Sequence, residues 1–175
     1  MKKLILLLLT SILLVATACA SGNTDTVVST GSTTRGDTMN ITITIMNATG
    51  KTHTLNATLA ENKSAVAFAE LLKKGAVTVA MHDYGSFEKV GSLGSSLPRT
   101  DTQITTEAGD IILYQGNQIT IYYDTNSWNF TRLGKVVSTL RQGSVTTSST
   151  TSITQAELKQ ILGKGDVTAV FDILR

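Results

Sequence analysis

The residues whose side chains are best suited to chemistry or ligand binding lie close together near the middle of the chain. Asp83 and Glu88 are carboxylates, and the aromatic residues Tyr84 and Phe87 lie between them. Carboxylates and aromatic rings on a loop of a rigid scaffold commonly contact ligands. The same segment contains Gly85, so it could instead be a tightly turned loop that packs over the fold. We keep both interpretations and name Tyr84, Phe87 and Glu88 as candidate ligand-binding residues.

A second candidate segment surrounds Trp128, the only tryptophan. Asn126, Phe130 and Arg132 are its neighbours, and an aromatic ring beside an amide and a guanidinium could hold a peptide or a sugar. A Trp and a Phe in such a segment more often fill a core, and we favour that interpretation for this pair. If a ligand cleft exists, we expect Trp128 and Arg132 to contribute to it together with Gln103.

The histidines give little support for a metal site. His82 has the wrong parity for the buried face of its predicted strand and could be an acid, a base or a solvated residue, whereas His53 shares the parity of Leu55. Neither histidine has a carboxylate at metal-ligand spacing. We therefore predict no metal and no other cofactor. Asp110 follows a glycine in a predicted turn, where such residues usually bond to backbone amides, so we assign it a structural role.

Several function classes are excluded. No serine lies in a nucleophile elbow, and no glycine pattern for binding phosphate is present. The chain has 175 residues with 15 Lys and Arg against 13 Asp and Glu. Lys2 and Lys3 fall in a predicted signal peptide, so the mature chain would be neutral. A neutral chain lacks the charge with which a basic protein binds nucleic acid.

These candidates must be positioned by short strands. Residues 40–46 alternate apolar and polar side chains, with Ile41, Ile43 and Ile45 on one face, and they form a predicted hairpin with residues 51–59. Further strands are expected at residues 76–81, 103–105, 111–114, 119–123, 132–137 and 167–174. Residues 83–98 and 144–152 are expected to be loops.

Two short helices complete the predicted elements. Residues 63–74 place apolar side chains at helical spacing and end at Gly75. Thr154 and Glu157 have the spacing of a capping box at the start of the second helix. This many short strands with two helices in residues 39–175 favours a single, mainly β domain that forms a small closed barrel.

Four segments together resemble the bacterial cyclophilin-like proteins. They are D-Y-G-S-F-E-K-V-G-S-L-G from position 83, S-L-P from 96, T-E-A-G-D-I-I-L-Y-Q-G-N-Q-I from 106 and N-S-W-N-F-T-R-L-G-K-V from 126. The resemblance covers roughly residues 39–136, and the last helix and strand fit the same barrel. It implies a closed eight-stranded β-barrel with two short helices. It does not imply an activity, because fold and function separate easily.

The isomerase residues of true cyclophilins cannot be carried over to this chain. Those enzymes use an arginine, an F-x-M-x-Q pocket, a tryptophan and a histidine, and no F-x-M-x-Q is present here. We therefore expect a binding module for a small molecule or peptide and lean against an enzyme. The alternative is a divergent peptidyl-prolyl isomerase in which Arg99 or Arg132 replaces the missing arginine. A third possibility is a structural or partner-binding protein without pocket chemistry.

The start of the chain predicts export and lipid anchoring. Lys2 and Lys3 precede an apolar run that is too short to span a bilayer comfortably. Ala16-Thr17-Ala18-Cys19 then resembles the lipobox of bacterial lipoproteins, in which the cysteine is acylated and becomes the new N-terminus. An ordinary secretory signal is the alternative. Residues 1–19 are thus a predicted lipoprotein signal peptide.

The segment after Cys19 predicts a flexible connection. Residues 20–38 are rich in Ser, Thr and Gly and cannot bury enough apolar surface to offset their ordering entropy. Anchor and tether together predict a monomer held at a membrane by Cys19 and facing the outside of the cell or the periplasm.

Overall fold

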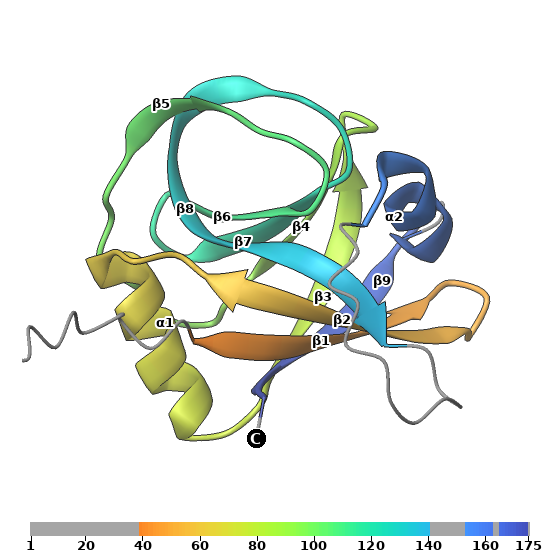
Figure 1. Ribbon diagram of the computed structural model, residues 1–175, viewed down its shortest axis with the longest axis horizontal. Helices are drawn as coiled ribbons and strands as arrows, with labels where there is room; N and C mark the ends of the chain where they lie inside the picture. The colour runs from red at the N-terminus through yellow and green to blue at the C-terminus, as the bar shows by residue number, and fades with distance from the viewer. Residues whose placement is uncertain (1–38, 141–152, 163–164, 175) are drawn as a thin grey trace, which may run out of the picture. The chain divides into compact units, whose positions relative to one another are not determined.

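The structure, a computed structural model, describes residues 39–140, 153–162 and 165–174. The predicted signal peptide, the lipidated Cys19, the tether at residues 20–38 and the loop at residues 144–152 lie outside the described residues. Nine strands and two helices are present in the described part of the chain (Figure 1). In order they are β1 (Asn40–Asn47), β2 (Thr52–Leu59), α1 (Lys63–Lys73), β3 (Val77–Tyr84), β4 (Glu88–Ser92), β5 (Thr102–Thr105), β6 (Asp110–Tyr114), β7 (Gln118–Tyr122), β8 (Ser127–Leu140), α2 (Gln155–Leu162) and β9 (Val167–Ile173).

Eight of these strands close into a barrel. Their order is β2-β1-β9-β3-β4-β7-β6-β8, every pair is antiparallel, and pairing between β2 and β8 completes the ring. β5 lies outside the ring, and within the described part of the chain it pairs only with the first residues of β8. The prediction of a closed eight-stranded, mainly β barrel with two short helices is therefore confirmed.

Alternation along the strands builds the core. Ile41, Ile43 and Ile45 of β1 are fully buried inside the barrel, as their period of two predicts. Leu55 and Ala57 of β2 join them. The hairpin predicted at the start of the domain is present, with Ile43 opposite Leu55.

The two helices begin where the sequence predicts. The Asn62 side chain caps α1 by accepting hydrogen bonds from the backbone N–H groups of Ser64 and Ala65. The Phe68 ring of α1 then packs edge-on against Phe171 of β9, with 5.8 Å between ring centroids. At α2 the capping box is formed: the Thr154 N–H donates to the Glu157 carboxylate, and the Glu157 N–H donates to the Thr154 hydroxyl.

The loop predicted at residues 83–98 is wrong for its first part, residues 83–92, and confirmed for residues 93–98. β3 continues to Tyr84 and β4 begins at Glu88, so the two strands form a hairpin inside this segment. Gly85 and Ser86 both have positive φ, near 58° and 59°, which permits the tight reversal. Gly85 and Ser86 therefore belong to a tight turn, whereas Gly94, Ser95 and Ser96 belong to the loop between β4 and β5.

β8 is also longer than predicted. It begins at Ser127 instead of residue 132, because β5 pairs with its first residues, Ser127 to Phe130. The additional residues place Trp128 and Phe130 on a strand, and this decides which way the two rings point.

Candidate functional site

The outer surface of the barrel carries a second aromatic cluster. On β6, Ile111 and Leu113 point into the main core, whereas Ile112 points outward. Ile112 is nevertheless buried, because Tyr122 of β7 and Phe130 of β8 pack with it on the outside. Solvated faces of antiparallel sheets are normally polar, so this surface is unusual.

The rings of this cluster are in continuous contact. Phe87 stacks on Tyr122 with 6.0 Å between centroids and an interplanar angle of 11°, and Tyr84 meets Phe87 edge-on at 5.9 Å. On the other side, Phe130 lies 5.8 Å from Tyr122 and 6.4 Å from Tyr114. The aromatic groups therefore form one continuous surface that extends from β3 to β8.

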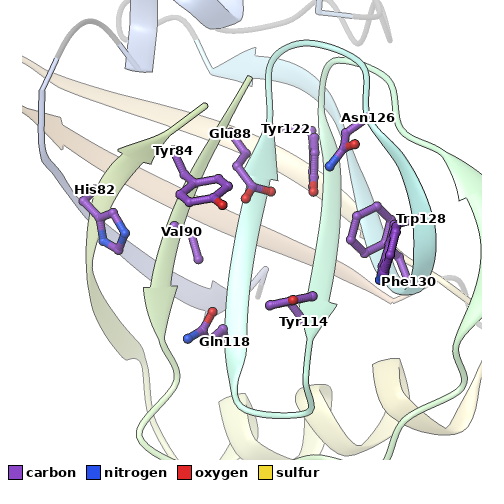
Figure 2. Close-up of a pocket in the computed structure, with 10 residues that line it drawn as sticks. All are labelled: His82, Tyr84, Glu88, Val90, Tyr114, Gln118, Tyr122, Asn126, Trp128 and Phe130. Atoms are coloured by element: carbon purple, nitrogen blue, oxygen red, sulfur yellow. The ribbon is translucent and has the colours of Figure 1, made fainter. Parts of the chain in front are cut away.

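An open cleft of about 410 Å³ lies on this surface. Its volume falls within the range of small-molecule sites, roughly 300–1,000 Å³. Figure 2 shows side chains from β3, β4, β6, β7 and β8 around it. The lining residues are His82, Tyr84, Glu88, Val90, Tyr114, Gln118, Tyr122, Asn126, Trp128 and Phe130.

Strand register places Glu88 between two tyrosines. Tyr84 of β3 is directly opposite Glu88 of β4, and Glu88 is directly opposite Tyr122 of β7. Directly opposed side chains on one face lie roughly 5 Å apart at Cβ. The Glu88 side chain extends from β4 into the space between the two tyrosines (Figure 2).

The Glu88 carboxyl group is buried and incompletely satisfied. The residue is only 7% exposed, and its Oε2 atom has no hydrogen-bond partner among the described residues. Burial raises the pKa of Glu88, and hydrogen bonding by Tyr122 and the charge of His82 counteract only part of that effect. Burial, with the neighbouring Glu88, also raises the pKa of Tyr122 above its ordinary value.

The other face of β4 holds Glu88 in place. Lys89 is fully buried, and its Nζ donates to the Asp83 carboxylate at 2.9 Å and to the carbonyl of Gly165 at 2.7 Å. Asp83 also accepts a hydrogen bond from the Tyr123 hydroxyl. β4 is therefore fixed to β3, β7 and the turn before β9, which limits movement of Glu88.

Three of the six predicted ligand-binding residues line the cleft. They are Tyr84, Glu88 and Trp128. Phe87 does not line it but supports it from beneath, through its contacts with Tyr84 and Tyr122.

The remaining two predicted residues lie elsewhere. Gln103 lines an adjoining hollow of about 580 Å³, which shares Tyr114 and Trp128 with the cleft. Arg132 lines neither, because its guanidinium donates to the buried Asp110 carboxylate at 2.9 Å. Arg132 therefore does not join the other candidates.

The structure also decides several alternatives left by the sequence. Trp128 is 61% exposed, so its interpretation as a core residue is wrong, whereas Phe130 is buried. Asp110 is fully buried and accepts a hydrogen bond from the Glu107 backbone N–H, as its predicted structural role requires. His82 is exposed and lines the cleft.

Four of the residues that line the cleft were not singled out from the sequence: Val90, Tyr114, Gln118 and Tyr122. Tyr114 and Tyr122 lie in predicted strands and Gln118 lies beside one, but no outward direction was predicted for these side chains. Their parity carried the signal: Ile119 and Ile121 point inward, so Gln118 and Tyr122 must point outward. Aromatic residues at outward positions of several strands would have indicated this surface.

The residues that line the cleft give little support for isomerase chemistry. Arginine is absent from the described residues that line it. Arg99 lines the adjoining hollow, but its guanidinium is paired with the Asp101 carboxylate. Across the described ranges, no group of three potential metal ligands is present. The helices within those ranges are all too short or too polar to cross a membrane.

Comparison with known proteins places the chain in a family. A family model described as "Cyclophilin-like family" matches residues 48–170, which is most of the barrel. The comparison with curated proteins gave no match. With the closed eight-stranded barrel already described, this match shows that the chain belongs to the cyclophilin-like family.

Proposed function

We propose that this protein is an extracytoplasmic binding module, anchored to a membrane through Cys19, that binds a small molecule or peptide in the aromatic cleft. One observation carries the binding proposal: an open cleft on the outside of the barrel, lined by aromatic rings around a buried carboxyl group. A concave apolar site with a few convergent polar groups is typical of ligand binding. A purely structural protein would not need it.

Ligand binding can be followed through the protein's own fluorescence. Trp128 is the only tryptophan and lies in the cleft. A library of small molecules and short peptides is titrated into the full chain while Trp128 emission is recorded. We expect saturable changes that Tyr84→Ala weakens by about tenfold or more, because Tyr84 is a large exposed lining residue.

Met46→Ala is the matched control for this titration. Met46 is also a large exposed apolar residue, but it lies on β1, which contributes nothing to the cleft. Binding should be unaffected by this change. Ligands that bind without altering Trp128 emission, or a library without any ligand, would refute the proposed site.

A divergent peptidyl-prolyl isomerase is the alternative function. It is supported only by the position of Arg99 beside Tyr114 and Trp128 in the adjoining hollow. An Xaa-Pro peptide is mixed with the full chain, and cis/trans exchange is measured by NMR exchange spectroscopy. A binding module leaves the exchange rate unchanged. Accelerated exchange that Arg99→Ala abolishes would establish the isomerase instead.

The lipid anchor is tested separately. The full chain is expressed in a bacterium that processes lipoproteins, and its mass and fractionation are compared with those of Cys19→Ser. We expect acylation and membrane association that the substitution removes, because acyl chains on the cysteine supply the membrane affinity. Release of an unacylated chain from the unsubstituted protein would contradict the lipoprotein assignment.

A further inference from the structure

The cleft contains a buried carboxyl group, and no lysine or arginine among the described lining residues can pair with it. Glu88 is 93% buried by difference from its 7% exposure, and Oε2 lacks a hydrogen-bond partner among the described residues. An unpaired buried carboxylate is costly, and proteins usually pair such groups. The adjacent Lys89 cannot serve, because it points to the opposite face of β4 and binds Asp83.

The charges of the lining residues favour one sign of ligand. Glu88 is the only carboxylate among them, and lysine and arginine are both absent from the described lining. His82 is the only lining group that can become cationic, and it lies across the cleft from Trp128 (Figure 2). An anionic ligand would meet Glu88 without a fixed positive partner.

The rings provide the second half of a cation site. Tyr84, Tyr114, Tyr122, Trp128 and Phe130 all line the cleft, and Tyr84 and Trp128 are 59% and 61% exposed. The face of an aromatic ring attracts cations, and clusters of such rings recognise quaternary ammonium groups. In this cleft the rings surround the carboxyl group rather than excluding it.

We propose that the cleft binds the ammonium group of an organic cation, with Glu88 as the counter-ion and the aromatic rings as the cage. This inference rests on the proposed binding function and names its ligand class. The volume of about 410 Å³ leaves space for the remainder of the ligand beside its ammonium group. A free alkylammonium compound and a lysine side chain share this chemistry.

Glu88 also gives the site a pH dependence. The titratable groups that face it are His82 and Tyr84 of β3 and Tyr122 of β7. Burial raises the pKa of Glu88, so acidification neutralises the counter-ion and weakens cation binding.

The test compares cations with neutral molecules of the same shape. Choline is paired with 3,3-dimethylbutan-1-ol, and N-acetyl-lysine amide is paired with N-acetyl-norleucine amide. Each is titrated into the full chain while Trp128 emission is recorded. We expect at least one cation to bind about tenfold more tightly than its neutral partner. The pair that shows the difference identifies the source of the ammonium group.

Two variants assign the selectivity to Glu88. Glu88→Gln removes the charge with little change in shape. It should abolish the preference for the cation and also the weakening of cation binding that protonation of Glu88 causes on acidification. Glu107→Gln makes the same change at an exposed carboxylate that pairs with Lys135, outside the cleft, and should leave both unaffected. If Glu88→Gln fails to fold, the comparison of each cation with its neutral partner in the unsubstituted chain still shows whether the cleft prefers cations.

The outcomes separate this inference from the proposed function. Neutral molecules that bind as tightly as their cations, or library ligands that occupy the cleft while neither cation binds, would overturn the cation site and leave the binding module intact. Cation selectivity that survives in a folded Glu88→Gln variant would also overturn it. Failure of every probe and every library member would overturn both.

Discussion

At the scale of residues, two neighbouring residues of β4 differ in whether their charged groups have partners within the protein. Glu88 faces the cleft, and its Oε2 atom has no hydrogen-bond partner among the described residues, whereas Lys89 faces inward and is paired with Asp83. This contrast follows from the alternation of side chains along a strand. The Lys89 ammonium group is hydrogen-bonded within the fold, whereas Glu88 keeps one acceptor oxygen without a partner among the described residues.

The Tyr122 hydroxyl should lower the pKa of Glu88. Its hydrogen bonding favours the ionised carboxylate and partly offsets the effect of burial. Tyr122→Phe removes the hydroxyl and keeps the ring that stacks on Phe87. We expect the pKa of Glu88 to rise further, as measured by NMR titration of its side-chain carboxyl carbon. An unchanged or lower pKa would show that Tyr122 does not act on Glu88.

Breaking the buried ion pair should cost more than removing it. Asp83→Ala leaves Lys89 charged and buried, which we expect to lower the free energy of unfolding by about 3 kcal/mol, the low end for such pairs because Asp83 is partly exposed. Lys89→Met added to Asp83→Ala should recover part of this loss. Urea denaturation measures the free energy of unfolding of the single and the double variant. A double variant that is less stable than Asp83→Ala alone would contradict this expectation.

At the scale of elements, close strand approach constrains β8. Gly134 pairs with both β2 and β6, and a Cβ atom there would overlap the carbonyl oxygen of Thr58. Gly134→Ala should therefore destabilise the protein by about 1–3 kcal/mol, as overpacking typically does. Thermal denaturation followed by circular dichroism measures the change.

Gly50→Ala adds the same atoms in the β1–β2 turn. Gly50 has a φ of 79°, but a Cβ atom there meets nothing within 4 Å. Only backbone strain should result, about 1 kcal/mol. A larger loss at Gly50 than at Gly134 would show that steric overlap is not what β8 avoids.

Local patterns in the sequence account for most elements but not for the cleft. The β1–β2 hairpin and both helices were predictable because alternation, helical spacing and caps act over a few residues. The β3–β4 hairpin was missed because its turn resembles a loop in composition. The cleft combines outward residues of five strands, and only the strand order β3-β4-β7-β6-β8 brings them together. The pattern of side chains along one strand does not show which strands are neighbours in the barrel.

At the scale of the whole molecule, paired carboxylates should govern stability in acid. The pKa of Asp101 is lowered by its hydrogen bond from Arg99, and that of Glu107 by Lys135. Burial acts to raise the pKa of Asp83, but hydrogen bonds from Tyr123 and Lys89 outweigh it, and the pKa is lowered. Each lowered pKa contributes stability above the ordinary carboxyl range that is lost as pH falls through the folded-state value.

The free energy of unfolding should therefore fall as the pH drops below about 4, where carboxylates of the unfolded chain also take up protons. Glu88 has the opposite sign and acts at higher pH, because its raised pKa lets the folded state take up a proton before the unfolded chain does. Its contribution to stability therefore grows as the pH falls from the folded-state pKa of Glu88 to about 4 and is constant below. Urea denaturation of the unsubstituted chain and of Glu88→Gln across both ranges measures the two effects. The gain above about pH 4 should be absent in Glu88→Gln, and a gain that persists in this variant would contradict the assignment.

The closed barrel gives the cleft a rigid base. Closure between β2 and β8 leaves no open edge in the ring, and the inner faces of the cleft strands are held by the main core. The outer aromatic surface is thus preorganised without contributing to that core. A site of this kind can change its ligand through outward residues while the barrel stays the same.

The most direct test of this account is an NMR map of the ligand-binding surface. Two-dimensional ¹H–¹⁵N spectra of the full chain are recorded with the fragment library, an Xaa-Pro peptide and choline. We expect bound ligands to shift the Trp128 indole signal together with the amide signals of Tyr84, Glu88 and Tyr122. Shifts confined to β1, β2 and β9, or no shifts with any ligand, would contradict it.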